Sequence, residues 1–267
     1  MRYVRLSVLA ALGGGSLLAA PAGSASPAIF HAPIAVWSQR QSSNWSGYNQ
    51  GSLEQGHELF TSVSGTWVVP TATQHTSREQ EYSSTWIGIG GGCVNASCSI
   101  IDATLIQEGT EQDVAKDGSP SYNAWWELIP APEVRISNFP VHAGDKMAGT
   151  ITQLAPGLWK FTLSNKTTGR TFTKTVPYPS SRDTVEWITE TPLIIGAGAG
   201  FAAMPNLGTV KMDLGLVNGS NPHLKPSETL QLAPSGHIVA TPSAPDPDDD
   251  GFNDCVWATS CVAPGSS

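Results

Sequence analysis

Apolar and polar residues alternate over short stretches through most of the chain beyond residue 42. In TVEWITE (184–190), Val185 and Trp187 share one face of an extended segment, while Glu186 and Glu190 share the other, because side chains alternate across a strand. Such runs hold β-branched and aromatic residues and are separated by Gly, Pro, Asn or Asp, which is typical of strands joined by turns. The predicted strands are 59–70, 82–91, 104–112, 122–130, 134–141, 147–154, 158–165, 171–176, 184–190, 209–217 and 237–243.

Two turns have sequences that predict hairpins. Pro156 and Gly157 follow the run 147–154, and Gly169 lies between the next two runs. No stretch free of Gly and Pro shows sustained helical periodicity. The pattern therefore predicts an all-β fold, an antiparallel β-sandwich of two large sheets, formed as one domain by residues 42–267.

The N-terminal region differs from the rest of the chain. Residues 1–25 have the pattern of a secretory signal peptide: Arg2 and Arg5, an apolar run over 6–20, and small residues before a cut after Ala25. Residues 26–41 are rich in Ala, Pro and Ser and predict a short N-terminal arm or pro-segment. We therefore expect a secreted, extracellular protein.

The charge balance limits the partners. Charged residues make up 13% of the chain, and 14 Lys and Arg stand against 22 Asp and Glu, a net charge of -8. Without the two arginines of the signal peptide the balance is 12 - 22 = -10, which suits an acidic medium. This balance argues against nucleic acid and against an anionic membrane as partners. We expect a monomer.

The four cysteines form two local pairs, Cys93 with Cys98 and Cys255 with Cys261. In a secreted chain, two short-loop disulfides are the favoured outcome among three connectivities. Neither spacing matches a zinc site, and the six histidines are scattered.

Two other motifs, a dinucleotide-binding loop and a calcium loop, are incomplete in the sequence. We expect no cofactor and no metal. The GAGFAA segment (198–203) resembles a dinucleotide loop, but Pro205 leaves no room for the helix that such a loop requires. Asp246, Asp248, Asp250 and Gly251 match the first half of a calcium loop, whereas Trp257 stands where the bidentate Glu would be needed. An acidic turn is the expectation there, with calcium left open.

Polar residues within aromatic strands carry the best functional signal. Gln107, Glu127 and Glu186 each lie in a run otherwise suited to a sheet, and a buried Gln requires hydrogen-bonding partners. Singly, each fits a satisfied amide or a solvated charge. Together with three tryptophans, they predict a cleft on one sheet face. The tryptophans are Trp86, Trp125 and Trp126.

At these residues the chain resembles the glutamic peptidases, or eqolisins. The resemblance lies in six ordered motifs, SSNWSGY, VSGTWVVPT, SSTWIGIGG, LIQEGTEQ, YNAWWELIPAPE and VEWITETP, from about Ser42 to Phe252. It implies a sandwich of two antiparallel sheets and a secreted acid endopeptidase that acts on polypeptides. It also implies a catalytic pair, Gln107 and Glu186.

The chemistry of the two residue types fits that implication. A carboxylate at Glu186 would take a proton from the attacking water, and the Gln107 amide would donate to the oxyanion without changing charge in acid. The resemblance places Trp86, Trp125 and Glu127 in the substrate cleft. We assign Glu111 and Asn123 to the same cleft, with Glu127 or Glu111 as the group that must be protonated for activity.

The chain departs from the family at three points. Gly90 and Asn123 stand where many relatives have Asp, and residues 26–41 are shorter than the pro-segments of fungal members. Two alternatives use the same residues. A β-sandwich glycosidase would pair Glu127 with Glu186, and a lectin-like module would use the aromatic face without catalysis.

Overall fold

The computed structural model describes residues 28–196 and 199–265. Within them, nineteen strands and two 3-10 helices follow one another. The strands are β1 (Ala28–Phe30), β2 (Val36–Ser38), β3 (Gln41–Ser42), β4 (Trp45–Gly51), β5 (Ser62–Val68), β6 (Ser84–Gly90), β7 (Leu105–Val114), β8 (Pro120–Leu128), β9 (Val134–Arg135), β10 (Lys146–Ala155), β11 (Leu158–Asn165), β12 (Arg170–Pro177), β13 (Thr184–Glu190), β14 (Leu193–Ile195), β15 (Gly200–Phe201), β16 (Thr209–Val217), β17 (Thr229–Leu232), β18 (Ala240–Pro242) and β19 (Phe252–Val256); the helices are η1 (Pro226–Glu228) and η2 (Pro234–Gly236).

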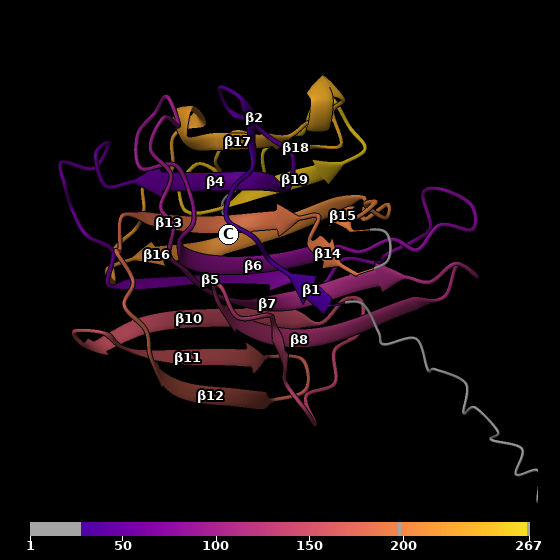
Figure 1. Ribbon diagram of the computed structural model, residues 1–267, viewed down its shortest axis with the longest axis horizontal. Helices are drawn as coiled ribbons and strands as arrows, with labels where there is room; N and C mark the ends of the chain where they lie inside the picture. Colours follow the sequence, from indigo (N-terminus) through magenta and orange to yellow (C-terminus); the bar gives the residue numbers. More distant parts are fainter. Residues whose placement is uncertain (1–27, 197–198, 266–267) are drawn as a thin grey trace, which may run out of the picture.

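Two large sheets form a sandwich, as the sequence predicts (Figure 1). One has the order β12-β11-β10-β5-β16-β19-β18, and the other has the order β17-β4-β13-β6-β7-β8-β9. Strand β17 joins them, because it pairs with β18 on one side and with β4 on the other. The pairs are antiparallel apart from β3 with β17. Both predicted hairpins are present, as β10–β11 and β11–β12.

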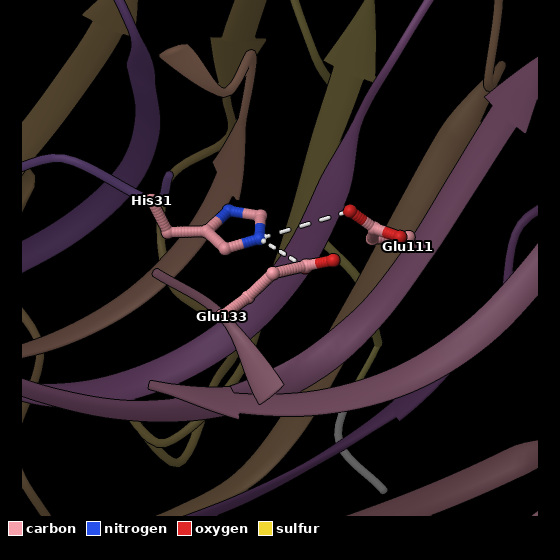
Figure 2. A group of neighbouring side chains, drawn as sticks. All are labelled: His31, Glu111 and Glu133. Carbon is pink, nitrogen blue, oxygen red and sulfur yellow. Dashed lines mark hydrogen bonds and ion pairs between the residues drawn. The ribbon is translucent and has the colours of Figure 1, made fainter. Parts of the chain in front are cut away.

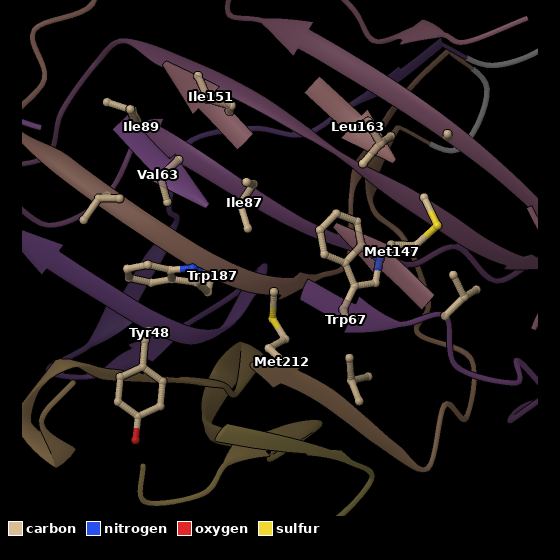
Figure 3. Packing of buried hydrophobic residues seen from close by; sticks show 14 of the residues in the cluster. Tyr48, Val63, Trp67, Ile87, Ile89, Met147, Ile151, Leu163, Trp187 and Met212 are labelled. Atoms are coloured by element: carbon tan, nitrogen blue, oxygen red, sulfur yellow. The ribbon is translucent and has the colours of Figure 1, made fainter. Parts of the chain in front are cut away.

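The core lies between the two sheets (Figure 3). Two indoles cross it: Trp187 of β13 donates to the Ser64 carbonyl at 2.9 Å, and Trp67 of β5 donates to the Thr110 hydroxyl at 2.9 Å. Gly65 allows this approach, because a Cβ there would lie 2.9 Å from the Trp187 ring. These contacts fix which face of β13 points inward, so Glu186 and Glu190 must point outward.

Trp126 corrects one expectation. We expected it in the cleft with Trp125, but neighbouring residues of a strand face opposite ways. Its ring packs in the sandwich interior on Phe161, with a centroid distance of 5.4 Å. Trp125 alone of the pair lies on the outer face.

Both predicted disulfides are present, Cys93–Cys98 and Cys255–Cys261, and the described residues include no free cysteine. The first closes a loop that follows β6. The predicted signal peptide lies outside the described residues, as does Gly198 of the GAGFAA segment. The remainder of that segment includes β15 and no helix. No helix among the described residues has the length and apolar character needed to cross a membrane.

Candidate active site

The outer face of the second sheet carries the predicted catalytic and cleft residues other than Trp126 in three parallel rows. Strands β4, β13, β6, β7 and β8 contribute one residue each to a row, and residues directly opposite on paired strands point the same way. The rows are Asn49–Glu186–Gly88–Gln107–Glu127, Gly47–Ile188–Trp86–Gly109–Trp125 and Trp45–Glu190–Ser84–Glu111–Asn123.

The predicted catalytic pair lies in the first row, with Gly88 between its members. Glu186 is opposite Gly88, and Gly88 is opposite Gln107. Two strand spacings therefore separate their backbones, about 9.5 Å. Gly88 adds no side chain between them, and a Cβ there would lie 2.8 Å from the Trp86 ring. The carboxylate and the amide therefore face the same side of the sheet with no side chain of β6 between them.

The N-terminal strap, which we define as residues 28–35, lies across this face (Figure 1). It begins as β1, paired with β14, and Ile34 packs among Trp45, Trp86 and Ile188. Buried Asn44 holds the far end of the strap, because Asn44 Oδ1 accepts a hydrogen bond from Ala35 N at 2.8 Å. The strap covers Gln107, and both Gln107 and Glu186 are 0% exposed.

His31 makes the central contacts of the strap. Its backbone carbonyl accepts a hydrogen bond from Gln107 Nε2 at 2.7 Å, and its backbone N–H donates to Glu127 Oε2 at 3.0 Å. Its ring stacks on Trp125 with a centroid distance of 3.7 Å and an angle of 9°. The strap thus presents a peptide carbonyl to the amide that the sequence assigns to the oxyanion.

Carboxylates surround the His31 ring on both nitrogens. Nδ1 lies 3.0 Å from Glu190 Oε2, and Nε2 lies 3.2 Å from Glu133 Oε2 and 3.9 Å from Glu111 Oε1. Figure 2 shows the ring pointing from the strap toward Glu111 and Glu133. Burial disfavours a protonated His31 ring, but the charge of Glu190 and the hydrogen bonds to Glu133 and Glu190 outweigh this effect. The pKa of His31 is therefore raised well above 6.5. A protonated ring donates from both nitrogens, so His31 can pair with Glu190 and Glu133 at the same time.

Asn49 and the disulfide loop hold Glu186. Asn49 Nδ2 donates to Glu186 Oε1 at 3.2 Å, and Asn49 Oδ1 accepts from Cys93 N at 2.8 Å. Gly92 closes over both, since a Cβ there would lie 2.5 Å from Glu186 Oε1. The other carboxylate oxygen, Oε2, is buried without a hydrogen-bond partner. One oxygen is therefore oriented and the other is left for a proton or a water.

Gln107 uses both amide protons. Nε2 donates to the His31 carbonyl and, at 2.8 Å, to Glu127 Oε2, while Gln107 Oε1 is buried without a partner. Glu127 thus fixes the direction in which the amide points. A sequence reading predicts that a buried Gln needs such partners, and the structure supplies them.

The carboxyl groups of this face have perturbed pKa values. Burial, followed by the charge of Asp102, raises the pKa of Glu186 well above 4.5. Burial raises the pKa of Glu127 to about 8, although the His31 charge opposes it. Burial also raises those of Glu111 and Glu190. For Glu133, burial is outweighed by its hydrogen bond with His31, and the pKa is lowered. With the strap in place, most of these groups hold protons in acid.

Known proteins match both the sequence and this fold. The profile of the Peptidase A4 family matches residues 43–244. The chain belongs to the Peptidase A4 family. This confirms the resemblance to the glutamic peptidases, whose motifs lie within the matched residues apart from Ser42.

The relatives of the A4 chain are distant. Aspergillopepsin-2 of Aspergillus niger is 26% identical over 193 residues, which are 64% of this chain and 63% of that protein. The chain thus spans less than two thirds of that relative. Two solved structures share the fold at 20–21% identity, each covering 80% of this chain and 98% of its own. They are scytalido-glutamic peptidase with a transition state analog inhibitor, TM-score 0.59, and SCP-B with the tripeptide Ala-Ile-His, TM-score 0.56.

The structure explains one departure from the A4 family pattern and locates another. Gly90 has φ +97°, and a Cβ there would lie 2.1 Å from the Thr104 carbonyl oxygen, so this backbone excludes Asp. Asn123 donates a short hydrogen bond to Glu111 Oε2, which also accepts from Arg135 Nη2 at 2.9 Å. An Asp at 123 would face Glu111 with a like charge.

Sequence reasoning missed four residues of the site: His31, Asn49, Glu133 and Glu190. Glu190 shares a face with Glu186 by simple alternation, so that signal was available. Asn49 lies four residues after Trp45 in β4. Only the pairing of β4 with β13, which places Asn49 opposite Glu186, shows that it can hold the carboxylate. His31 and Glu133 lie outside the strands that the sequence predicts.

Proposed function

We propose that the chain is a secreted acid endopeptidase that hydrolyses peptide bonds with Glu186 as general base and Gln107 as oxyanion donor. The observation that carries the proposal is the row Glu186–Gly88–Gln107, in which the Gln107 amide already binds a peptide carbonyl, that of His31. The A4 family match supports the reaction class.

The geometry supports a general-base mechanism. Glu186 takes a proton from a water in the gap over Gly88, and the water oxygen bonds to the carbonyl carbon. Gln107 N–H donates to the oxygen that gains negative charge. The protonated Glu186 then gives its proton to the amide nitrogen as the C–N bond breaks, which returns the carboxylate.

Polypeptide is the proposed substrate, and two features support it. SCP-B was solved with the tripeptide Ala-Ile-His, so a relative of the same fold binds a short peptide. In this chain the cleft holds a peptide of its own, the strap, through backbone contacts to Gln107 and Glu127. Backbone contacts of this kind accept many side chains, as an endopeptidase requires.

The strap is the proposed pro-segment. Its His31 carbonyl occupies the Gln107 amide, where the carbonyl of a substrate would bind. A working enzyme needs the strap displaced or cleaved so that Gln107 can bind substrate, and water in the open cleft would lower the raised pKa of Glu186. The signal peptide that we propose for residues 1–25 would deliver this latent form outside the cell.

The register argues against the glycosidase alternative. Glu186 and Glu127 lie three strand spacings apart in the first row, about 14 Å between backbones. Gln107 lies between the two glutamates and binds Glu127 Oε2 at 2.8 Å, so the contacts of Glu127 orient the amide and do not pair Glu127 with Glu186. No contact in the structure favours a lectin-like role over hydrolysis.

The test compares two variants with matched controls after incubation in acid. Glu186→Gln should abolish hydrolysis of acid-denatured protein, and Gln107→Ala should lower kcat by roughly 10²-fold. Glu79→Gln and Gln80→Ala make the same chemical changes outside the cleft and should leave turnover unchanged. Circular dichroism must show all four folded. Near-normal turnover in folded Glu186→Gln, or hydrolysis of xylan or glucan in place of protein, would refute the proposal.

A further inference from the structure

Three aspartates far from the cleft meet at one point of the first sheet. Asp213 lies on β16, and Asp246 and Asp250 lie in the loop between β18 and β19. Their nearest carboxylate oxygens all lie within 4.8 Å of one another. Within 4 Å of these three side chains, no Lys, Arg or His among the described residues forms an ion pair. Three like charges converge without a protein counter-charge.

The orientation of Asp246 points to a ligand. Its side chain is 3% exposed; Oδ1 accepts from Asp250 N at 3.1 Å, and Oδ2 is buried with no partner. Asp250 Oδ1 is likewise buried and unpaired. A buried, unpartnered carboxylate oxygen is unfavourable unless a proton or a cation satisfies it.

Gly251 keeps the meeting point open. A Cβ at this position would lie 2.7 Å from both Asp213 Oδ1 and Asp246 Oδ2, and 3.0 Å from the Met212 carbonyl oxygen. Two carboxylate oxygens and a backbone carbonyl therefore face the same small volume, which any larger residue would enter. Hard oxygen donors of this kind suit calcium or magnesium.

The donor set favours the larger ion. Ca²⁺ binds several carboxylates and backbone carbonyls in irregular geometry, whereas Mg²⁺ usually keeps several waters and takes one or two carboxylates. Three carboxylates within 4.8 Å of one another, beside a backbone carbonyl, resemble the first of these arrangements. The bend in β16 supports the arrangement, because its register with β5 shifts between Asp213 and Leu216.

We propose that Asp213, Asp246 and Asp250 bind a divalent cation, calcium in preference to magnesium, which ties the β18–β19 loop to β16. The EF-hand-like run of the sequence supplies only part of this site: Asp248 is exposed, and Asp213 comes from a strand more than thirty residues earlier. No residue of the cleft takes part, so the site serves stability and not the peptidase reaction.

Acid opposes the binding. Only ionised carboxylates bind a cation, so protons and calcium compete for the oxygens of the three aspartates, and binding should weaken in acid.

Terbium and calcium provide two independent readouts on the full chain. Gly215 lies between the site and Trp187: its N–H donates to the Asp250 carbonyl at 2.9 Å, and a Cβ on it would lie 3.4 Å from the indole. Tb³⁺ bound by the aspartates should therefore show emission sensitised by Trp187. Calcium at about 10 mM should raise Tm at pH 7 by about 3–10 °C, as for a site of sub-millimolar to millimolar affinity.

Charge-matched variants locate the ion. Asp246→Asn and Asp250→Asn should each abolish the calcium shift and the Tb³⁺ emission, while raising Tm without calcium because a repulsion is relieved. Asp248→Asn removes the same charge from the same loop and should keep both signals. The proposal is wrong if the wild type shows neither signal at pH 7, or if Asp246→Asn and Asp250→Asn fold and respond like the wild type.

Discussion

Replacing His31 tests the proposed latent state, because the His31 ring makes the main side-chain contacts between the strap and the cleft. The ring stacks on Trp125 and donates to Glu190 and Glu133. Charge-assisted hydrogen bonds contribute about 1.5–3 kcal/mol each, and an aromatic stack about 0.5–1.5 kcal/mol. Removing one member of a buried ion pair costs about 3–5 kcal/mol in measured cases. We take about 3 kcal/mol as the loss for His31→Ala, because the freed Glu190 can hold a proton.

That loss predicts that the strap binds the cleft roughly 100-fold more weakly, since about 1.4 kcal/mol corresponds to a tenfold change in affinity. The direct assay uses the activated enzyme and synthetic peptides in trans. AIFHAPIA (28–35) should inhibit hydrolysis, and the same peptide with His31→Ala should have a Ki roughly 100-fold higher. In the full chain, His31→Ala should shorten the lag before activity appears, whereas exposed His237→Ala should not.

The pH dependence has a definite sign. The His31 pKa is raised, so its cation holds the strap fully below 6.5 and is lost as pH rises through the raised value. The Glu133 pKa is lowered, so its charge holds the strap above 4.5 and is lost as pH falls through the lowered value. Glu111, Glu127 and Glu190, which also face His31, have raised pKa values and take up protons first. Inhibition should therefore be strongest between these limits and fall in strong acid.

Two results would refute this account of the strap. Equal Ki values for the two peptides would show that the ring contributes nothing. Inhibition that strengthens continuously below pH 4 would show that Glu133 is not the residual counter-charge.

Three further predictions concern the cleft and the core. Asn49→Ala should lower kcat/KM about tenfold or more and shift its acid limb to higher pH, because the Asn49 hydrogen bond favours the charged form of Glu186; an unchanged limb in the pH–rate profile would contradict it. Asn123→Asp should shift the alkaline limb upward in the same assay, because a second carboxylate beside Glu111 raises the pKa of the pair, and a limb that does not move would exclude Glu111 as the group required in protonated form. Burial raises the pKa of Glu108 to about 8, so the folded state binds this proton more tightly than the unfolded state does. The free energy of unfolding should therefore decline as pH rises from about 4.5 to 8. Glu108→Gln should flatten this decline, measured by calorimetry as the fall in Tm with pH.

The sheet that carries the site was predictable because alternation and register act together. Val185 and Trp187 are apolar and face the core, so Glu186 had to face out, and the six ordered motifs identified Gln107 as its counterpart. Trp126 was the error in this set. Two adjacent tryptophans cannot share a face of a regular strand, and the alternation rule would have separated Trp125 from Trp126.

The strap and the aspartate site could not be predicted in the same way, because each depends on contacts between remote segments. The sequence AIFHAPIA has no motif, and its position follows from β1 pairing with β14 and from Asn44 at its far end. Asp213 lies in a run that predicts an ordinary strand. Only the folded sheet brings it to the loop of Asp246 and completes a set of oxygens that the linear calcium pattern lacks.

Among the described residues, seven acidic residues are 0% exposed, a number that suits an acidic setting. They are Glu81, Glu108, Glu111, Glu127, Glu186, Glu190 and Asp254. Burying an ionised carboxylate without a partner is strongly unfavourable, whereas a protonated carboxyl is an ordinary hydrogen-bonding group. Asp254, with a pKa raised to about 7 and a hydrogen bond from Ser46, fits that use. The acid in which the proposed base must still ionise is thus the same condition that favours folding of the surrounding sandwich. The active enzyme therefore needs a Glu186 pKa below those of its buried neighbours, which stay neutral.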